Sequence, residues 1–211
     1  MYTDITGIIL SGGKSSRMGE NKSFLKIGDK YVIEIIASLM TSLFQEVMLI
    51  TNEPEQFKFL NLLSFKDIYP GKGPLAGIHS GLIHASNQKG FVISCDMLLV
   101  TREMIEYLAN FKTSKEITVA KADGFIQQLC GLYDKRCIPA AEAILSAFAT
   151  NEGRDTEQLK RKCSILRLID DVGAEIINAE ELPFYSKDLF FNMNRKDEYE
   201  YVRNRLMITK N

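Results

Sequence analysis

Short apolar runs that alternate with helical patterns constrain this chain more than any other feature of its sequence. Residues 5–10, 47–50 and 91–94 are apolar runs of strand length, and polar or glycine-rich residues follow each of them. Residues 32–43 and 75–82 carry apolar side chains at helical spacing. This alternation predicts a Rossmann-like α/β fold with a doubly wound, mostly parallel sheet. Such sheets bind their ligands at the carboxyl ends of the strands.

The later segments continue the alternation. Thr101 precedes an apolar helical stripe and is expected to cap that helix. Two strands and a helix are expected after it, over residues 117–120, 127–133 and 138–148. Residues 153–183 are less periodic and more polar, so we expect a peripheral segment there. A last short strand over 190–193 and a closing helix over 195–207 complete the prediction.

Length and charge limit what the chain can be. A chain of 211 residues is long enough for one buried α/β core and short for two, so we expect a single domain over 1–211. The formal net charge of −1 provides no positive field for a nucleic acid backbone. No stretch approaches the roughly 20 apolar residues of a membrane span. The four cysteines form no CxxC pair, which is typical of reduced thiols, and we expect a cytoplasmic monomer.

The loop after the first apolar run carries the main chemical signal. Residues 11–22 read SGGKSSRMGENK. Gly12 and Gly13 let backbone N–H groups approach a polyphosphate closely. The guanidinium of Arg17 can bind phosphate oxygens with two donors, and Lys22 adds a point charge on a flexible stem. These groups together predict a triphosphate-binding loop.

Two common phosphate-binding motifs are not met in this loop. Lys14 and Arg17 stand where the dinucleotide fingerprint GxGxxG needs its second and third glycines, and Ile8 stands where a P-loop needs its first. A glycine-rich turn with solvated basic side chains is the plainer alternative. The combination of a strand, two glycines, an arginine and a lysine favours phosphate binding.

Asp96 follows the apolar run 91–94 at a predicted strand end. A carboxylate there could hold Mg²⁺, which usually takes one or two carboxylates together with phosphate oxygens of the substrate. An aspartate that caps a helix or closes a turn fits the residues equally well.

The loop over residues 11–22 resembles the signature of nucleotidyltransferases built on a Rossmann-like sheet. Residues 73–78 (GPLAGI), 95–97 (CDM) and 191–198 (FNMNRKDE) resemble, in the same order, segments of the molybdenum cofactor guanylyltransferases. The resemblance covers nearly the whole chain. It implies transfer of GMP from GTP to the phosphate of molybdopterin with release of pyrophosphate, and Mg²⁺ as the cofactor. It also implies molybdenum cofactor carriers or target enzymes as further partners.

The resemblance divides the chain into a nucleotide-binding half at about 1–110 and an acceptor-binding half at about 111–211. It implies that Asp96 is the magnesium ligand and that Lys22 and Arg17 act on the phosphates. It also implies a set of nucleotide contacts: Leu10, Ser11, Gly12, Gly13, Lys22, Asn52, Asp67 and Asp96. Among these, the carboxylate of Asp67 could accept hydrogen bonds from the N1 and N2 donors of guanine. Asn192 and Asn194 are expected on the acceptor side.

Two other functions remain open at this stage. A cytidylyltransferase acting on molybdopterin or on another small phosphate would use a similar loop. A non-catalytic nucleotide-binding protein is the second alternative, and the presence of both Lys22 and Asp96 argues against it. The acceptor phosphate is already anionic at neutral pH, so no general base is required, and His79 is expected to serve packing or to lie at the surface and not to act in catalysis.

Overall fold

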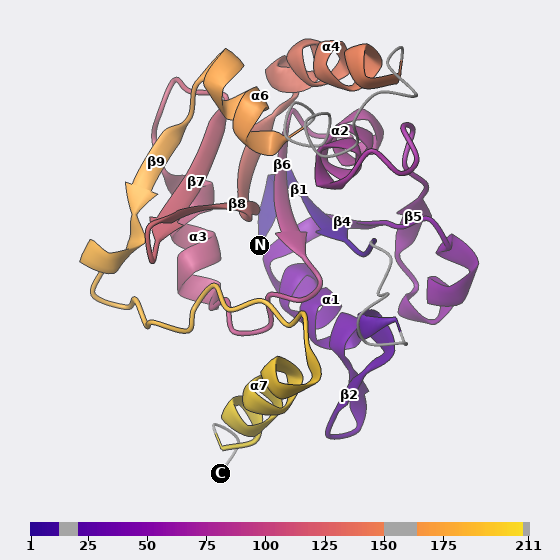
Figure 1. Ribbon diagram of the computed structural model, residues 1–211, viewed down its shortest axis with the longest axis vertical. Coiled ribbons are helices and arrows are strands. Elements are labelled where there is room, and N and C mark those ends of the chain that lie inside the picture. The colour runs from indigo at the N-terminus through magenta and orange to yellow at the C-terminus, as the bar shows by residue number, and fades with distance from the viewer. Residues whose placement is uncertain (13–20, 150–163, 209–211) are drawn as a thin grey trace.

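The protein is described by a computed structural model, which covers residues 1–12, 21–149 and 164–208. A seven-stranded sheet forms its centre, in the order β5-β4-β1-β6-β8-β7-β9 (Figure 1). Its strands are β1 (Tyr2–Leu10), β4 (Phe44–Ile50), β5 (Leu63–Phe65), β6 (Lys89–Ser94), β7 (Ile117–Ala122), β8 (Phe125–Asp134) and β9 (Glu175–Asn178). The predicted α/β fold with a doubly wound, mostly parallel sheet is confirmed.

The direction of the strands decides where a ligand can bind. β5, β4, β1 and β6 run parallel to one another, and β9 runs parallel to β7. β8 is antiparallel to both of its neighbours, β6 and β7. Leu10 pairs with Ile50 on one side and with Ser94 on the other. The carboxyl ends of β4, β1 and β6 therefore lie level at one edge of the sheet.

Helices cover both faces of the sheet (Figure 1), since successive side chains of a strand point to opposite faces. Ile8 packs with α2 (Pro74–His84), α4 (Ile138–Ala149) and α6 (Ile165–Val172) on one face. Ile9 packs with α1 (Val32–Leu43) and α3 (Arg102–Asn110) on the other. Thr101 caps α3 by accepting a hydrogen bond from the Met104 amide, as predicted.

Helix α2 lies unusually close to β1. A Cβ atom at Gly81 would stand 2.5 Å from the Cγ2 atom of Ile8, a distance that side chains do not adopt. The glycine therefore brings the helix down onto the strand. The start of α2 then lies beside the carboxyl end of β1, where the candidate site is found.

Two sequence expectations are wrong in this fold. Within residues 153–183, α6 buries Leu168 in the core and β9 joins the edge of the main sheet, so the segment is not peripheral. The pattern looked irregular because β9 buries only one of its four residues. Residues 190–193 form no strand, although Phe190 and Met193 are buried. An irregular segment can bury apolar side chains as well as a strand can, so an apolar run alone does not identify a strand.

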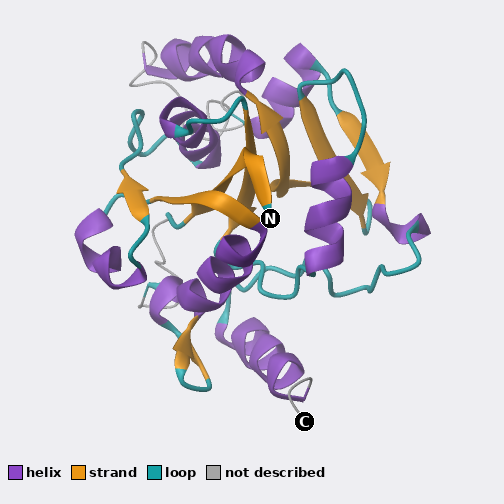
Figure 2. Cartoon of the chain, turned by 180° about the vertical axis from the view of Figure 1, so that it is seen from behind, coloured by secondary structure: helices purple, strands orange, loops and turns teal. Residues whose placement is uncertain are grey.

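The closing helix α7 (Lys196–Ile208) confirms the last predicted element. It lies beside a small hairpin of β2 (Lys26–Ile27) and β3 (Lys30–Tyr31), apart from the main sheet (Figures 1 and 2). The Tyr199 hydroxyl donates a hydrogen bond to the Lys26 carbonyl. This contact joins the C-terminal part of the chain to the segment just after the glycine-rich loop.

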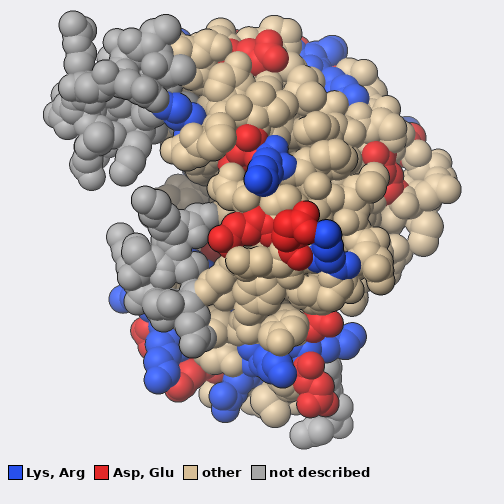
Figure 3. Space-filling model, turned by 90° about the vertical axis from the view of Figure 1, so that its right-hand side faces the viewer, with Lys and Arg blue, Asp and Glu red and all other residues tan. Residues whose placement is uncertain are grey.

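Charged side chains of both signs share the face drawn in Figure 3. In the coloured part of that view, lysines and arginines lie among aspartates and glutamates and form no extended basic area. Across the described ranges, no helix combines the length and the apolar character needed to cross a bilayer.

Candidate active site at the carboxyl edge of the sheet

The site is built where three parallel strands end together. The Ser11 amide donates to the Ile50 carbonyl (N···O 2.9 Å), and the Cys95 amide donates to the Leu10 carbonyl (N···O 3.0 Å). These bonds continue the sheet for one residue beyond the ends of the strands. They fix the start of the glycine-rich loop between the end of β4 and the segment that carries Asp96.

Lys22, Asp96 and Asn194 meet at this edge. The Lys22 Nζ atom lies 3.6 Å from Oδ2 of Asp96 and donates a hydrogen bond to Oδ1 of Asn194 at 2.7 Å. The other carboxylate oxygen of Asp96 accepts a hydrogen bond from the Ser94 hydroxyl at 2.6 Å. The side chains of Lys22 and Asp96 are 19% and 18% exposed, so both charged groups remain accessible to a ligand.

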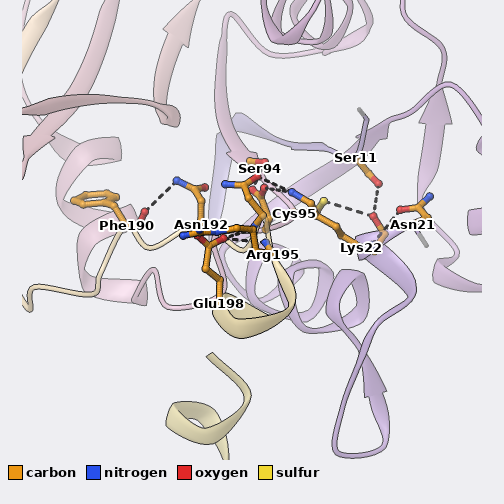
Figure 4. Close-up of polar contacts among 12 residues, drawn as sticks. Ser11, Asn21, Lys22, Ser94, Cys95, Phe190, Asn192, Arg195 and Glu198 are labelled. Atoms are coloured by element: carbon orange, nitrogen blue, oxygen red, sulfur yellow. Dashed lines mark hydrogen bonds and ion pairs between the residues drawn. The ribbon is translucent and has the colours of Figure 1, made fainter. Parts of the chain in front are cut away.

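Local structure places Lys22 in this position. Asn21 precedes a short 3₁₀ helix (Lys22–Phe24) and caps it, since its side-chain oxygen accepts a hydrogen bond from the Ser23 amide. The Ser23 hydroxyl bonds that of Ser11 (O···O 2.7 Å) and contacts the Cys95 sulfur at 3.5 Å (Figure 4). Ser23 therefore ties the loop's far end to the ends of β1 and β6.

The Cys95 thiol, next to Asp96, is buried. Burial, together with the negative charge of Asp96, raises the pKa of Cys95 to about 11. A thiol with that pKa stays protonated at neutral pH and is a poor nucleophile.

The C-terminal segment reaches the site through backbone contacts. The Met193 amide donates to the Asp96 carbonyl (N···O 3.4 Å). The carboxylate of Glu198 accepts hydrogen bonds from the amides of Asn194 (2.6 Å) and Arg195 (2.9 Å). Figure 4 shows Asn192, Arg195 and Glu198 gathered beside Lys22. A carboxylate in the first turn of α7 therefore holds the two amides that precede the helix, and Asn194 with them.

Asp67 lies between β5 and α2, on the α2 side of this edge. Its Oδ1 atom is buried and has no hydrogen-bond partner among the described residues, and burial raises the pKa of the carboxyl group. A Cβ atom at Gly77 would lie 3.6 Å from that oxygen and 3.2 Å from the Leu10 side chain. Asp67 and Leu10 are therefore near neighbours around Gly77. The Ile68 amide donates to the buried Ser80 hydroxyl (2.8 Å), which fastens this loop to α2.

Of the other predicted nucleotide contacts, some lie within the described residues and some do not. Asn52 is exposed and follows the end of β4, beside the bond between Ser11 and Ile50. Gly12 is exposed, and none of the described residues lies within 4 Å of where its Cβ would stand, so these residues leave its backbone open to a ligand. Gly13 and Arg17 lie outside the described residues.

Asn192 lines a pocket next to Asp96. Its other lining residues come from the start of α2, the residue after Asp96, the first half of β8 and the start of α6: Pro74, Met97, Ile126, Gln127, Gln128, Leu129 and Ile165. The Asn192 amide donates to the Phe190 carbonyl at 3.2 Å, which fixes the side chain at the wall of the pocket. Asn192 and Asn194 thus border different parts of the site, because Asn194 contacts Lys22.

Several residues of the site were not found from the sequence. Ser23, Ser80 and Ser94 hold Ser11, the Asp67 loop and Asp96 in place, but isolated serines carry no pattern that marks them. Ser94 could have been noticed, since it stands two residues before Asp96 at a strand end. His79 is 1% exposed and contacts Glu142 (Nε2···Oε1 3.2 Å) on the side of α2 that faces α4, which confirms its packing role.

A doubly wound sheet whose carboxyl edge carries a lysine and an aspartate, with a glycine-rich sequence after its first strand, is the arrangement of a nucleotidyltransferase. Comparison with known proteins agrees with this class. Residues 7–161 match the family described as the MobA-like NTP transferase domain, and the chain belongs to that family.

Curated relatives share nearly the full length of the chain. A probable molybdenum cofactor guanylyltransferase of Clostridium perfringens (strain 13) is 36% identical over 199 residues, covering 91% of this chain and 92% of the relative. A protein of the same description from Carboxydothermus hydrogenoformans is 35% identical over 199 residues, covering 93% and 94%. The predicted resemblance to this branch of nucleotidyltransferases is confirmed.

Solved structures agree with the fold. A protein from Aquifex aeolicus VF5 superposes with a TM-score of 0.72 at 30% identity, covering 92% of this chain and 95% of that one. The molybdopterin-guanine dinucleotide biosynthesis protein A of Archaeoglobus fulgidus gives a TM-score of 0.77 at 21% identity, covering 96% and 98%. The second likeness is evidence for the fold alone.

Proposed function

We propose that the protein transfers GMP from GTP to the phosphate of molybdopterin, with Mg²⁺ as the cofactor and pyrophosphate as the second product. The observation that carries the proposal is the meeting of Lys22, Asp96 and Asn194 at the carboxyl edge. They come from three distant segments, and Lys22 stands at the end of the glycine-rich loop. The descriptions of the relatives as molybdenum cofactor guanylyltransferases support the choice of substrates.

The environment of Asp67 supports guanine as the base. Its buried Oδ1 atom lacks a hydrogen-bond partner in the part of the chain that the structure describes, and a buried acceptor of this kind costs free energy until a donor reaches it. Guanine presents two donors side by side, N1–H and the N2 amino group. Adenine presents an acceptor at N1 and would leave the carboxylate unpaired. We therefore assign Asp67 to the base, with Leu10 lying against it.

The residues at the edge fit a magnesium ion. One oxygen of Asp96 accepts a hydrogen bond from Ser94, and the other lies 3.6 Å from the ammonium group of Lys22. An accessible carboxylate oxygen beside a phosphate site is the donor that Mg²⁺ takes together with substrate oxygens. When bound, the ion would neutralise charge that develops on the phosphates. Asp96 would hold it, and Lys22 would turn to the triphosphate.

The reaction on this site is an in-line displacement. An oxygen of the acceptor phosphate attacks the α-phosphorus of GTP, the bond from that phosphorus to the β-bridging oxygen breaks, and pyrophosphate leaves. The attacking oxygen is anionic at neutral pH, so no proton has to be removed. Lys22 and the backbone around Gly12 contribute position and positive charge. We propose that Arg17 and Gly13 of the same loop act with them.

The two halves of the chain divide these tasks in our proposal. Residues 1–110 hold the nucleotide, with Ser11 and Asn52 on the ribose side, and residues 111–211 supply acceptor contacts through Asn192 and Asn194. We propose a cytoplasmic monomer that receives its acceptor from, or passes its product to, molybdenum cofactor carriers or target enzymes. The matches to guanylyltransferases favour this function over a cytidylyltransferase or a non-catalytic nucleotide-binding protein.

Thermal shift measurements with different nucleotides test the choice of base. A ligand that binds only the native state raises the melting temperature by mass action. In the presence of Mg²⁺, we expect GTP to raise the melting temperature by several degrees more than ATP or CTP at equal concentration. Equal shifts for GTP and CTP would favour the cytidylyltransferase. Pyrophosphate release with molybdopterin and each nucleotide in turn then tests the transfer itself.

Substitution of Asp67 by Asn should have opposite effects on stability and on binding. Burial raises the pKa of Asp67, so the folded state disfavours the charged carboxylate, and stability falls as pH rises above the carboxyl's unfolded pKa. We expect Asp67→Asn to raise the melting temperature of the nucleotide-free protein at pH 8. The same variant should bind GTP about tenfold more weakly, because an amide that replaces one acceptor oxygen cannot pair with both guanine donors.

Two outcomes of that experiment would count against the assignment. Unchanged GTP affinity in Asp67→Asn would remove Asp67 from the base site. A loss of stability at pH 8 would show that the carboxylate has a structural partner. Asp4→Asn is a matched control, since Asp4 is an exposed aspartate at the amino end of β1, the opposite edge of the sheet.

A further inference from the structure

Strand β8 carries a large irregularity beside the site. Val119 of β7 pairs with Gly131, but Lys121, two residues later, pairs with Ile126. Residues 127–130 of β8 therefore stand opposite Ala120 alone. On its other side β8 stays paired with β6 as far as Cys130, where the ladder ends. The strand bends at this place (Figure 1).

The irregularity forms one wall of the pocket next to Asp96. Residues 126–129 line that pocket, together with Met97 and Asn192. A bulge of this kind turns side chains away from the regular alternation, and bulges are common next to active sites. Residues 127–129 have left the ladder with β7, whereas Ile126, which also lines the pocket, still pairs with Lys121.

Tyr133 holds the irregularity in place from within the core. Its side chain is fully buried, and its hydroxyl donates a hydrogen bond to the Gln128 carbonyl at 2.6 Å. Burial raises the pKa of Tyr133, so the hydroxyl remains a donor at any pH the fold survives. The bond reaches the backbone that has left the β7 ladder, where a carbonyl would otherwise lack a partner.

The two glutamines of the bulge, Gln127 and Gln128, differ in the hydrogen bonds of their side chains. The side-chain amide of Gln127 donates hydrogen bonds to the backbone carbonyls of Ala122 (3.3 Å) and Phe125 (3.4 Å), so it closes the turn between β7 and β8. Gln128 is half-buried, and within the described residues its side-chain amide forms no hydrogen bond. A half-buried amide without a protein partner at a pocket wall offers a donor and an acceptor to a ligand.

We propose that the β8 bulge is the acceptor's ring-binding wall, with Gln128 as a contact to a flat heterocycle and Tyr133 as the positioning residue behind it. This inference rests on the proposed function for the identity of the acceptor. Ile126 and Leu129 are partly exposed and supply apolar surface for a ring face. Gln128 and Asn192 supply the amides that a ring edge of donors and acceptors requires. Met97 directly follows Asp96, so a phosphate on the ring's side chain reaches the reacting centre.

Fluorescence titration with 6-hydroxymethylpterin phosphate tests the proposal without turnover. We expect Gln128→Ala to raise the Kd of this pterin about five- to tenfold, the effect of one lost hydrogen bond in a half-buried site. Tyr133→Phe removes only the hydroxyl and should raise the same Kd several-fold. GTP affinity, measured separately, should stay within about twofold in both variants, because the nucleotide contacts lie on other elements.

Matched controls separate positioning from general destabilisation. Gln45→Ala removes an exposed glutamine on β4, away from the pocket. Tyr2→Phe removes a hydroxyl that accepts a hydrogen bond from Asn110 at the opposite end of the sheet. Both should bind the pterin like the unmodified protein. In steady-state assays, Gln128→Ala should raise the KM for molybdopterin more than it lowers kcat.

The outcomes distinguish this inference from the proposed function. Pterin binding by the unmodified protein that is unchanged in Gln128→Ala and Tyr133→Phe would overturn the inference and leave the guanylyltransferase standing. An unmodified protein that binds GTP but no pterin phosphate would overturn both. If Tyr133→Phe lowers pterin and GTP affinity equally, Tyr133 supports the fold in general and is not a positioning residue of the pocket.

Discussion

Asp96→Ala is expected to reduce kcat/KM for GTP by about 10³-fold, the range found when one electrostatic contact to a transition state is removed. Asp96 is the carboxylate that stands beside Lys22 at the edge, and its Oδ2 atom is the metal donor in the proposed reaction. Asp96→Asn keeps an acceptor for the Ser94 hydroxyl but removes the charge, so we expect it to be nearly as inactive.

Stability measurements show whether that loss arises at the site. An ion pair that is partly exposed contributes about 1 kcal/mol or less, so the melting temperature of Asp96→Ala should change by only a few degrees. Asp4→Ala should be as active as the unmodified protein. Full activity of Asp96→Ala in Mg²⁺ would remove both the metal assignment and the proposed mechanism. Titration with Mn²⁺ in the presence of GTP should show the metal site lost in both Asp96 variants.

Lys22→Ala is expected to lower kcat/KM for GTP by about 10²-fold, since its ammonium group lies 3.6 Å from Asp96 at the carboxyl edge of the sheet. The loss should exceed that of Lys14→Ala, a lysine inside the glycine-rich loop. Lys30→Ala changes an exposed lysine on the β3 hairpin and serves as the control. A larger loss in Lys14→Ala would mean that the phosphates lie nearer Gly13 than Lys22.

Substitution of Lys22 should lower kcat/KM for GTP but should strengthen metal binding when no nucleotide is present. Its ammonium group, 3.6 Å from Asp96, occupies the carboxylate and repels a cation. We expect Lys22→Met to bind Mn²⁺ about two- to fivefold more tightly than the unmodified protein when no nucleotide is present. With GTP bound, the phosphates draw Lys22 away, and this gain should disappear. Weaker Mn²⁺ binding in both states would mean that Lys22 supports the carboxylate structurally.

The sequence determined the elements whose signals are local. The apolar run that ends at Leu10 predicted β1 and the binding edge, because a strand buried on both faces reads as a continuous apolar run. Thr101 predicted the start of α3, because the hydrogen bond that caps a helix lies within its first turn. A short stretch of sequence is therefore enough to indicate it. The order of the GPLAGI, CDM and C-terminal segments predicted the family, which the family match confirms.

Only the tertiary structure decided the contacts that join distant segments. Lys22 and Asn194 are 172 residues apart, and nothing in the residues between them indicates that their side chains meet at 2.7 Å. The buried, unpaired oxygen of Asp67 arises from the approach of α2, and the pocket wall at Gln128 arises from a change of register between β7 and β8. Burial and strand register depend on the whole fold, so a local pattern carries no signal for them.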